Sequence, residues 1–188
     1  MRAGHGTGAG VMDFLASSYR VFKDLPSRRA DYKHYSTSDD PPFPLKYCST
    51  RWIGNIEAVE RIISCLPHLR SYVQAMQAKV TEPQSSSYRT MKAFLDDPLL
   101  KARLSFFLTI ARDLESFLTE FQADHPKIPF LYKALKDLLN IFMDRLFKPE
   151  VLIRQKNTSS RLALSFTEDN LLPRKAIDVG YVHTSNSI

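Results

Sequence analysis

The sequence lacks the features that mark membrane-spanning, secreted and disulfide-rich proteins. No apolar run reaches the roughly 18 residues that a membrane-spanning helix requires. The first ten residues are rich in glycine and alanine and lack the apolar core of a secretory signal. Only two cysteines occur in 188 residues, too few for a disulfide framework. These absences predict no membrane partner and a location in the reducing cytoplasm or nucleus.

Motifs of known catalytic or metal-binding type are also scarce. Glycines 6, 8 and 10 resemble part of a phosphate loop, but no strand precedes them and no Gly-Lys-Ser/Thr follows, so residues 1–10 are predicted to be a disordered leader. No Gly-x-Ser-x-Gly element is present. Cys65-x-x-His68 could offer two metal ligands and Cys48 a third, but a zinc site needs a second close pair. We therefore predict no metal site, no cofactor, no small-molecule substrate and no enzyme activity. A Cys–His pair that folding brings together stays open.

What the sequence does contain indicates a helical protein with a substantial core. The hydrophobic fraction is 44%, with 12 Phe and 8 Tyr, and the prolines lie mainly between apolar runs of helical spacing. The predicted fold is mostly all-α: an irregular helical bundle with a short extended segment and disordered termini. We expect a helical domain over residues 11–156 and a loop-rich tail with one short strand over 157–188. The expected helices lie at 11–24, 28–35, 50–66, 69–76, 98–123 and 130–147, with an extended piece at 45–48.

The most specific predictions about this bundle concern Pro67 and the helix over 98–123, which has the widest apolar stripe. Pro67 is predicted to end one helix before the next begins at Leu69. Residues 81–87 are predicted to form a polar loop. The helix over 98–123, capped by Asp97, has apolar residues on more than one face. It is therefore predicted to be the central, buried helix, with Phe107 in the core.

Basic residues provide the candidates for a nucleic-acid contact. The net charge is +6, and residues 41–80 and 127–156 carry +3 and +4 on either side of an acidic segment at 81–126. Such a distribution is compatible with contacts to phosphate, and it also occurs in domains that are merely soluble and basic. The candidate phosphate-binding residues are Lys46, Arg51, Lys133, Lys136 and Lys148.

The most individual local motif is Thr50-Arg51-Trp52, which contains the only tryptophan. One interpretation is that Trp52 anchors a helix to the core and Arg51 pairs with a carboxylate. The other is that Arg51 contacts phosphate while Trp52 stacks on an unpaired base, a contact worth roughly 1–3 kcal/mol.

An ordered series of segments resembles the transposases of hAT-type DNA transposons and the transposon-derived proteins related to them. The matching segments are residues 21–29, 43–52, 55–61, 102–107, 117–124, 128–131, 171–173 and 177–180, so the resemblance extends over about residues 11–181. Thr-Arg-Trp alone is short. The order of the whole series carries the resemblance.

The resemblance implies which part of such a transposase this chain corresponds to. The family's catalytic domain is RNase H-like and holds two divalent metals with three carboxylates, and a helical domain is inserted between the second and the third. The chain resembles the Arg-Trp junction and that insertion, and none of its acids matches the catalytic set. In the family, the tryptophan of this motif stabilises a flipped base. That role maps onto Trp52, with Arg51 as its neighbour.

Three functional hypotheses follow from these observations. The first is a catalytically inactive, nuclear remnant of a transposase that binds DNA weakly and without sequence preference. The second is a helical scaffold that binds a partner protein through an exposed apolar groove and has no relation to DNA. The third is an enzyme fragment that becomes active only when another chain supplies the missing parts.

Overall fold

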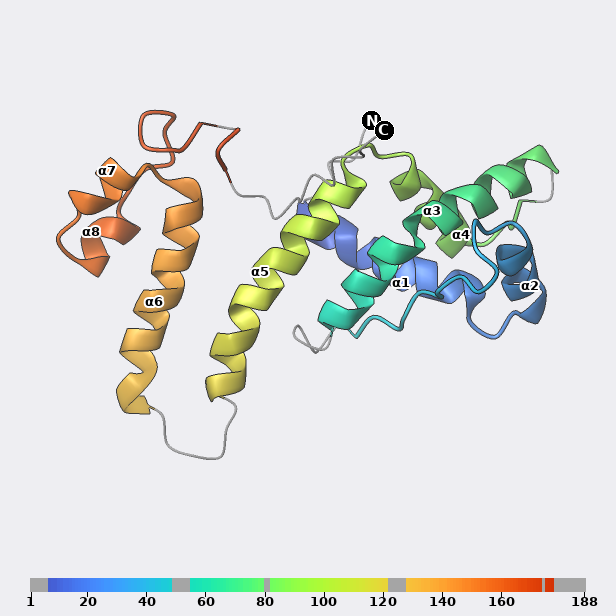
Figure 1. The fold of residues 1–188 in the computed structure, drawn as a ribbon, viewed down its shortest axis with the longest axis horizontal. Coiled ribbons are helices and arrows are strands. Elements are labelled where there is room, and N and C mark those ends of the chain that lie inside the picture. The colour runs from blue at the N-terminus through green and yellow to red at the C-terminus, as the bar shows by residue number, and fades with distance from the viewer. Residues whose placement is uncertain (1–6, 49–54, 80–81, 122–127, 174, 178–188) are drawn as a thin grey trace. The chain divides into compact units, whose positions relative to one another are not determined.

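The described part of the chain is mostly helical. The computed structural model describes residues 7–48, 55–79, 82–121, 128–173 and 175–177 (Figure 1). Within these ranges there are eight helices and no strand, which confirms the mostly all-α class. The helices are α1 (Thr7–Phe22), α2 (Pro26–His34), α3 (Ile56–Ala78), α4 (Ser86–Leu95), α5 (Leu100–Phe121), α6 (Ile128–Leu146), α7 (Pro149–Ile153) and α8 (Thr158–Leu162). None of them is long and apolar enough to span a membrane.

The chain divides into two compact units, residues 1–108 and 109–188, where the sequence predicts one helical domain over 11–156. The first unit contains α1 to α4 and the start of α5, and the second contains the rest of α5 with α6 to α8. Each unit has its own group of buried apolar residues. In the second unit, the apolar residues near the end of α6 pack on one another and on α7. The division therefore follows the two cores.

The core of the first unit is built mainly by α1, α3 and α4. Phe22, at the end of α1, is 2% exposed and lies at the centre of a group of aromatic rings. Its ring centroid is 4.7 Å from that of Tyr32 and 5.4 Å from that of Tyr72. Phe43, from the loop before the extended segment, closes the group at 4.9 Å from Tyr32. This packing fixes α2 and the following loop against α3.

Three buried side chains hold the extended segment in place. Tyr32 and Cys65 both donate hydrogen bonds to the carbonyl oxygen of Pro42, at 2.9 and 3.1 Å. Asn55, which is 1% exposed, bonds both main-chain groups of Cys48: its Oδ1 accepts from the Cys48 N–H at 2.9 Å, and its Nδ2 donates to the Cys48 carbonyl at 2.7 Å. The Asn55 side chain thus satisfies the main-chain N–H and carbonyl groups that a neighbouring strand would otherwise pair in the predicted extended piece.

Cys65 is expected to resist alkylation in the folded protein. Burial raises the pKa of its thiol from 9.0 to about 11, so at neutral or mildly alkaline pH it stays protonated, whereas the reactive form is the thiolate. Mass mapping after iodoacetamide treatment at pH 8 should show modification at the half-buried Cys48 first, and at Cys65 only after addition of denaturant. Equal rates at both thiols would contradict the packing around Cys65.

The predicted break at Pro67 is wrong, because α3 continues through it from Ile56 to Ala78. Pro67 is exposed, so the helix accommodates the ring on its solvent side. The opposite side is anchored on either flank of the proline by Leu66 and Leu69, both buried. Ser71 Oγ also donates to the Pro67 carbonyl at 3.2 Å. Burial along one face thus outweighs the loss of a single main-chain hydrogen bond.

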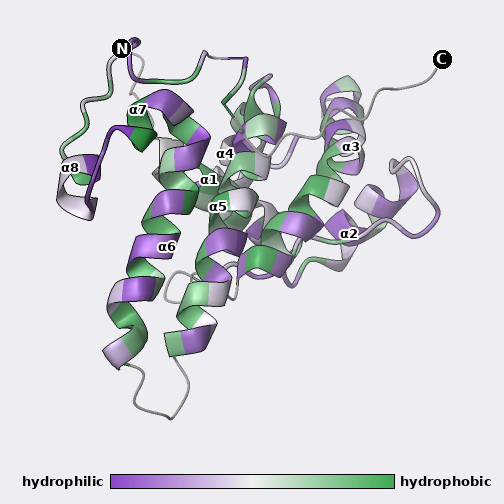
Figure 2. Ribbon diagram, turned by 60° about the vertical axis from the view of Figure 1, so that its left-hand side comes forward, coloured by the Kyte–Doolittle hydropathy of each residue, from purple (hydrophilic) through white to green (hydrophobic). Residues whose placement is uncertain are grey.

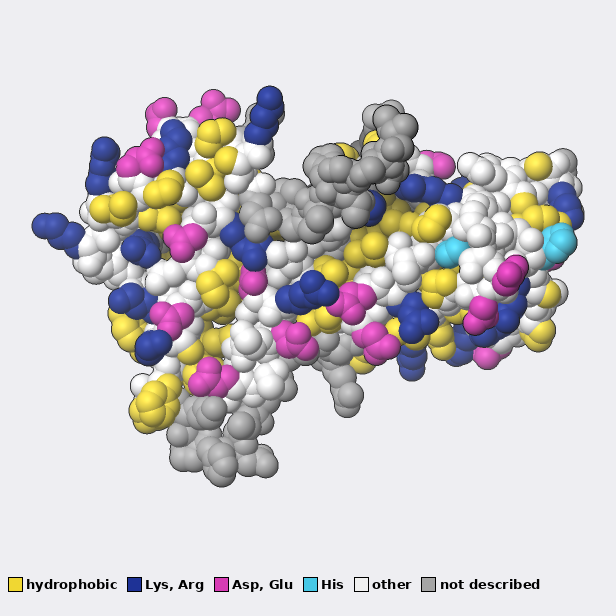
Figure 3. Space-filling view, viewed as in Figure 1, with side chains coloured by type: hydrophobic (Ala, Val, Ile, Leu, Met, Phe, Trp, Pro, Cys, Tyr) yellow, Lys and Arg dark blue, Asp and Glu magenta, His cyan; other side chains and the backbone are white. Residues whose placement is uncertain are grey.

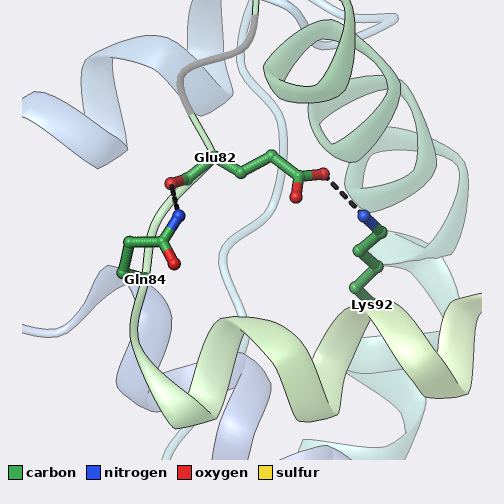
Figure 4. A network of polar contacts seen from close by, with 3 residues as sticks. All are labelled: Glu82, Gln84 and Lys92. Carbon is green, nitrogen blue, oxygen red and sulfur yellow. Dashed lines mark hydrogen bonds and ion pairs between the residues drawn. The ribbon is translucent and has the colours of Figure 1, made fainter.

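Helix α4 begins inside the region predicted to be a polar loop. Ser85 is its N-cap: the side chain accepts a hydrogen bond from the Tyr88 N–H at 3.3 Å. In the preceding segment, Glu82 forms an ion pair of 2.6 Å with Lys92, and the Gln84 side chain donates to the Glu82 carbonyl at 3.2 Å (Figure 4). Both charged side chains are about one-third exposed or less. The ion pair thus holds the segment from Glu82 to Gln84 against α4.

The predicted central role of the helix over 98–123 also needs correction. In the first unit α5 contributes Leu100 and Leu104 to the core, but Phe107 is only partly buried and Phe106 is exposed. A helix packed on one side can bury only one stripe, and the apolar residues of α5 are spread over a wider arc than that. The core is centred instead on the aromatic group around Phe22.

The two predicted terminal regions both contain ordered structure. α1 begins at Thr7, inside the predicted leader, whose first six residues lie outside the described part. In the predicted tail, α8 has a capping box between Asn157 and Ser160. The described part of the tail contains no strand, although one short strand was expected, and Leu171 there forms an isolated antiparallel bridge with Phe147. The start of the tail therefore packs on the end of α6.

Candidate protein-interaction groove

In the second unit, α6 exposes five large apolar residues: Ile128, Phe130, Tyr132, Leu135 and Ile141. Met143 is the only buried residue among the 19 of this helix, all of which are described. Apolar and polar residues alternate along the helix (Figure 2). Ile128, Phe130 and Tyr132 are each more than 60% exposed. Hydrophobic side chains are correspondingly visible on the surface of this unit (Figure 3). In an α-helix, residues four apart share a face and residues two apart do not, so Ile128 and Tyr132 are exposed on one side of α6 and Phe130 on the other.

A cavity of about 360 Å³ lies between the second half of α5 and the first half of α6. We define the α5–α6 groove by the residues that line it: Asp113, Ser116, Phe117, Glu120, Phe130, Lys133, Ala134, Asp137, Leu138 and Ile141. Half of these side chains are apolar and the others are charged or hydroxylic. An apolar floor with a few polar groups at its edges is the usual make-up of a binding cleft.

The wall of the groove is fixed by an ion pair between its two helices. Asp113 of α5 and Arg145 of α6 lie 2.7 Å apart, and their side chains are only 20% and 17% exposed. Low exposure strengthens the attraction between the two charges but also costs desolvation energy, and the loss of either partner would leave the other charge partly buried. The pair therefore sets the spacing between α5 and α6.

The lining of the groove carries more negative than positive charge. Three carboxylates line it, from Asp113, Glu120 and Asp137, against one ammonium group from Lys133. Lys133 lies 2.7 Å from Asp137, one turn further along α6, and this hydrogen bond raises the pKa of Lys133. Such a surface favours a basic ligand and disfavours a polyanion.

The structure assigns different settings to the basic residues predicted to contact DNA. Lys46 is exposed in the first unit, and Lys136 is exposed on α6. Lys133 is also exposed but is paired with Asp137. Lys148 is half-buried and donates to the carbonyl of Asp169 at 2.7 Å, so it binds the tail to the start of α7. Arg51 and Trp52 lie outside the described residues.

Lys133, Lys136 and Lys148 belong to the second unit, but two of them are engaged by acceptors within it. The carboxylates of the groove were not predicted as a site, because Asp113 and Glu120 come from one helix and Asp137 from another. Phe117 was not predicted as a site residue either. The one signal for the groove in the sequence was that the helices α5 and α6 both carry apolar residues over a wide arc of their surface.

No group of three or more His, Cys, Asp and Glu residues able to hold a metal ion occurs in the described ranges. No family model, curated protein or solved structure compared with this chain matches it. The resemblance to hAT-type transposases therefore stays a prediction from the sequence.

Proposed function

We propose that this chain is a helical protein-interaction scaffold whose α5–α6 groove receives an amphipathic helix of a partner protein. The observation that carries the proposal is that two exposed apolar residues of α6, Phe130 and Ile141, line a groove whose other residues are defined. A helix laid into such a groove buries residues spaced at i, i+3, i+4 and i+7. Burial of this apolar surface is the main source of free energy in such an association.

The charge of the groove specifies the kind of helix. Because carboxylates outnumber cations in the lining, lysine or arginine beside the apolar stripe of the partner helix would meet a negatively charged groove, in which Asp113 and Asp137 are paired with Arg145 and Lys133. Charge complementarity of this kind raises the association rate and excludes acidic partners more than it adds affinity. The proposed partner is therefore a basic amphipathic helix.

Weak DNA binding by an inactive transposase-derived remnant is the second proposal. It is supported by the net charge of +6 and by the exposure of Lys46 and Lys136. Binding through these residues would be independent of sequence and would fall steeply with salt, since phosphate contacts release counterions. It would take place in the nucleus. The remnant proposal predicts that the protein binds DNA, whereas the scaffold proposal predicts that it binds a basic helical peptide, so titration with both ligands distinguishes the two.

A fluorescein-labelled synthetic helix with leucines on one face and lysines on the other is the probe for the groove. Phe130→Ala should weaken its binding by about 2 kcal/mol or more, as for a central contact of an interface. Ile141→Ala, inside the groove, should weaken binding by about tenfold, ~1.4 kcal/mol. The same substitution at the exposed Ile153, outside the groove, should change nothing.

The matched probe with glutamates in place of the lysines should bind more weakly to the unchanged protein. Equal loss of affinity for Ile141→Ala and Ile153→Ala would place the binding surface elsewhere and refute the groove. A parallel titration with single-stranded and duplex DNA at two salt concentrations tests the second proposal. If DNA binds and the lysine peptide does not, the scaffold proposal fails and the remnant reading replaces it. In that case Trp52→Ala should weaken single-strand binding by about 1–3 kcal/mol.

A further inference from the structure

A pair of hydroxyl groups contacts a histidine in the first unit, far along the chain from the groove residues. Ser36 Oγ lies 2.6 Å from His68 Nδ1, and Thr37 Oγ1 lies 2.9 Å from the same nitrogen. Both hydroxyls follow the end of α2, and His68 is on α3. One ring nitrogen can donate or accept a single hydrogen, so two hydroxyls compete for it. Thr37 is exposed, whereas Ser36 is half-buried.

The residues that follow Thr37 are acidic. Asp39 and Asp40 stand two and three positions after it, and a Pro-Pro pair comes next. Asp40 is 93% exposed and lies 3.6 Å from Lys33. Protein kinases select their substrates by the pattern of charges around the accepting hydroxyl. Ser38 has Pro41 at the third position after it, so Thr37 combines exposure with the more acidic context.

We propose that Thr37 is a phosphorylation site for an acid-directed, ATP-dependent protein kinase, and that His68 binds the phosphate once it is attached. In the reaction, Thr37 Oγ1 forms a bond to the γ-phosphorus of ATP, the bond from that phosphorus to the β–γ bridging oxygen breaks, and ADP leaves. The hydroxyl proton passes to the base of the kinase. The site is independent of the groove and of the function proposed for it.

The surroundings of Thr37 explain how the product would be held. A phosphate on this residue carries about two negative charges and three acceptor oxygens. The His68 ring nitrogen that now contacts the hydroxyl would donate to one of those oxygens. Lys33 lines the same hollow as Thr37 and adds positive charge, and His34 lines it too. Asp39 lines it too and opposes the phosphate, so the ammonium of Lys33 and the imidazole of His68 must outweigh that repulsion.

The test is incubation of the full chain with an acid-directed kinase and ATP, with the modified residue located by fragment mass spectrometry. One phosphate on Thr37 is expected, with no incorporation in Thr37→Ala and unchanged incorporation in Ser38→Ala. Asp40→Asn should slow the reaction because it removes an acidic determinant. Lack of incorporation into the unchanged chain, or incorporation at Ser36 or Ser38 in place of Thr37, would overturn the assignment.

The role of His68 has its own readout. Phosphorylation should raise the melting temperature by about 4 °C or more if the new contact is worth about 1 kcal/mol in a unit of this size. The rise should be absent in His68→Gln, in which the hydroxyl is still phosphorylated but the imidazole is missing. The same rise in both proteins would show that His68 does not hold the phosphate.

Discussion

Replacing Phe22 by alanine is expected to lower the free energy of unfolding by about 3–5 kcal/mol, as truncation of a fully buried aromatic ring does. Phe22 is 2% exposed and contacts the rings of Tyr32, Phe43 and Tyr72. Its loss would leave a cavity where α1, α2 and α3 meet, and these rings are too well fixed to fill it. Urea denaturation followed by circular dichroism gives the value.

Phe106→Ala is the matched control for this substitution. The same atoms are removed, but Phe106 is 41% exposed on α5, so a change within about 0.5–1 kcal/mol is expected. If both alanine variants lost the same stability, the first unit would not be centred on the aromatic group. A loss larger for Phe106 than for Phe22 would restore α5 as the central helix.

The second unit should be destabilised to a similar extent by Phe147→Ala. Its buried group contains few residues, chiefly Met143, Phe147 and Leu152, and Phe147 is 1% exposed. A loss of about 3–5 kcal/mol is expected there. Hydrogen exchange measured by mass spectrometry should show faster exchange in peptides from α6 and α7. Peptides from α1 and α3 should keep their protection, because they belong to the other core.

Phe166→Ala serves as the control in the second unit. Phe166 lies 5.2 Å from Phe147, ring centroid to ring centroid, but is 71% exposed, so its removal should cost about 1 kcal/mol or less. Faster exchange in α1 and α3 after Phe147→Ala would contradict the division into two cores. Unchanged exchange in α6 would contradict the placement of Phe147.

Helix positions followed from the sequence wherever an apolar stripe and a stop signal agreed. Pro26 separates α1 from α2 at the predicted place, and Pro149 both follows α6 and starts α7. These positions are predictable because proline fixes its own backbone angle and lacks a donor, whatever surrounds it. At Pro67 the same local rule failed. The outcome there depended on residues buried against α1 and α4, which are distant in sequence.

Helix α4 and the groove show two further limits of sequence reasoning. α4 buries Tyr88, Met91 and Leu95, which are spaced as one helical face, and Ser85 was an available cap signal. This helix was therefore within reach of the pattern rules. The groove was not, because its charged lining comes from two helices and depends on the gap between them. Nor could the sequence show that the side chain of Lys148 donates a hydrogen bond to the carbonyl of Asp169.

The bridge between the end of α6 and the tail also determines how far this chain can be shortened. Tails of polar composition usually tolerate removal, because few contacts hold them. Here Lys148 donates its main-chain N–H to Asn170 at 2.9 Å, and Leu172 donates to Leu146 at 2.8 Å. A stop codon placed at residue 157, where the helical pattern fades, would remove both bonds and uncover Phe147. The shortest stable version of the second unit therefore has its C-terminal boundary beyond Leu172.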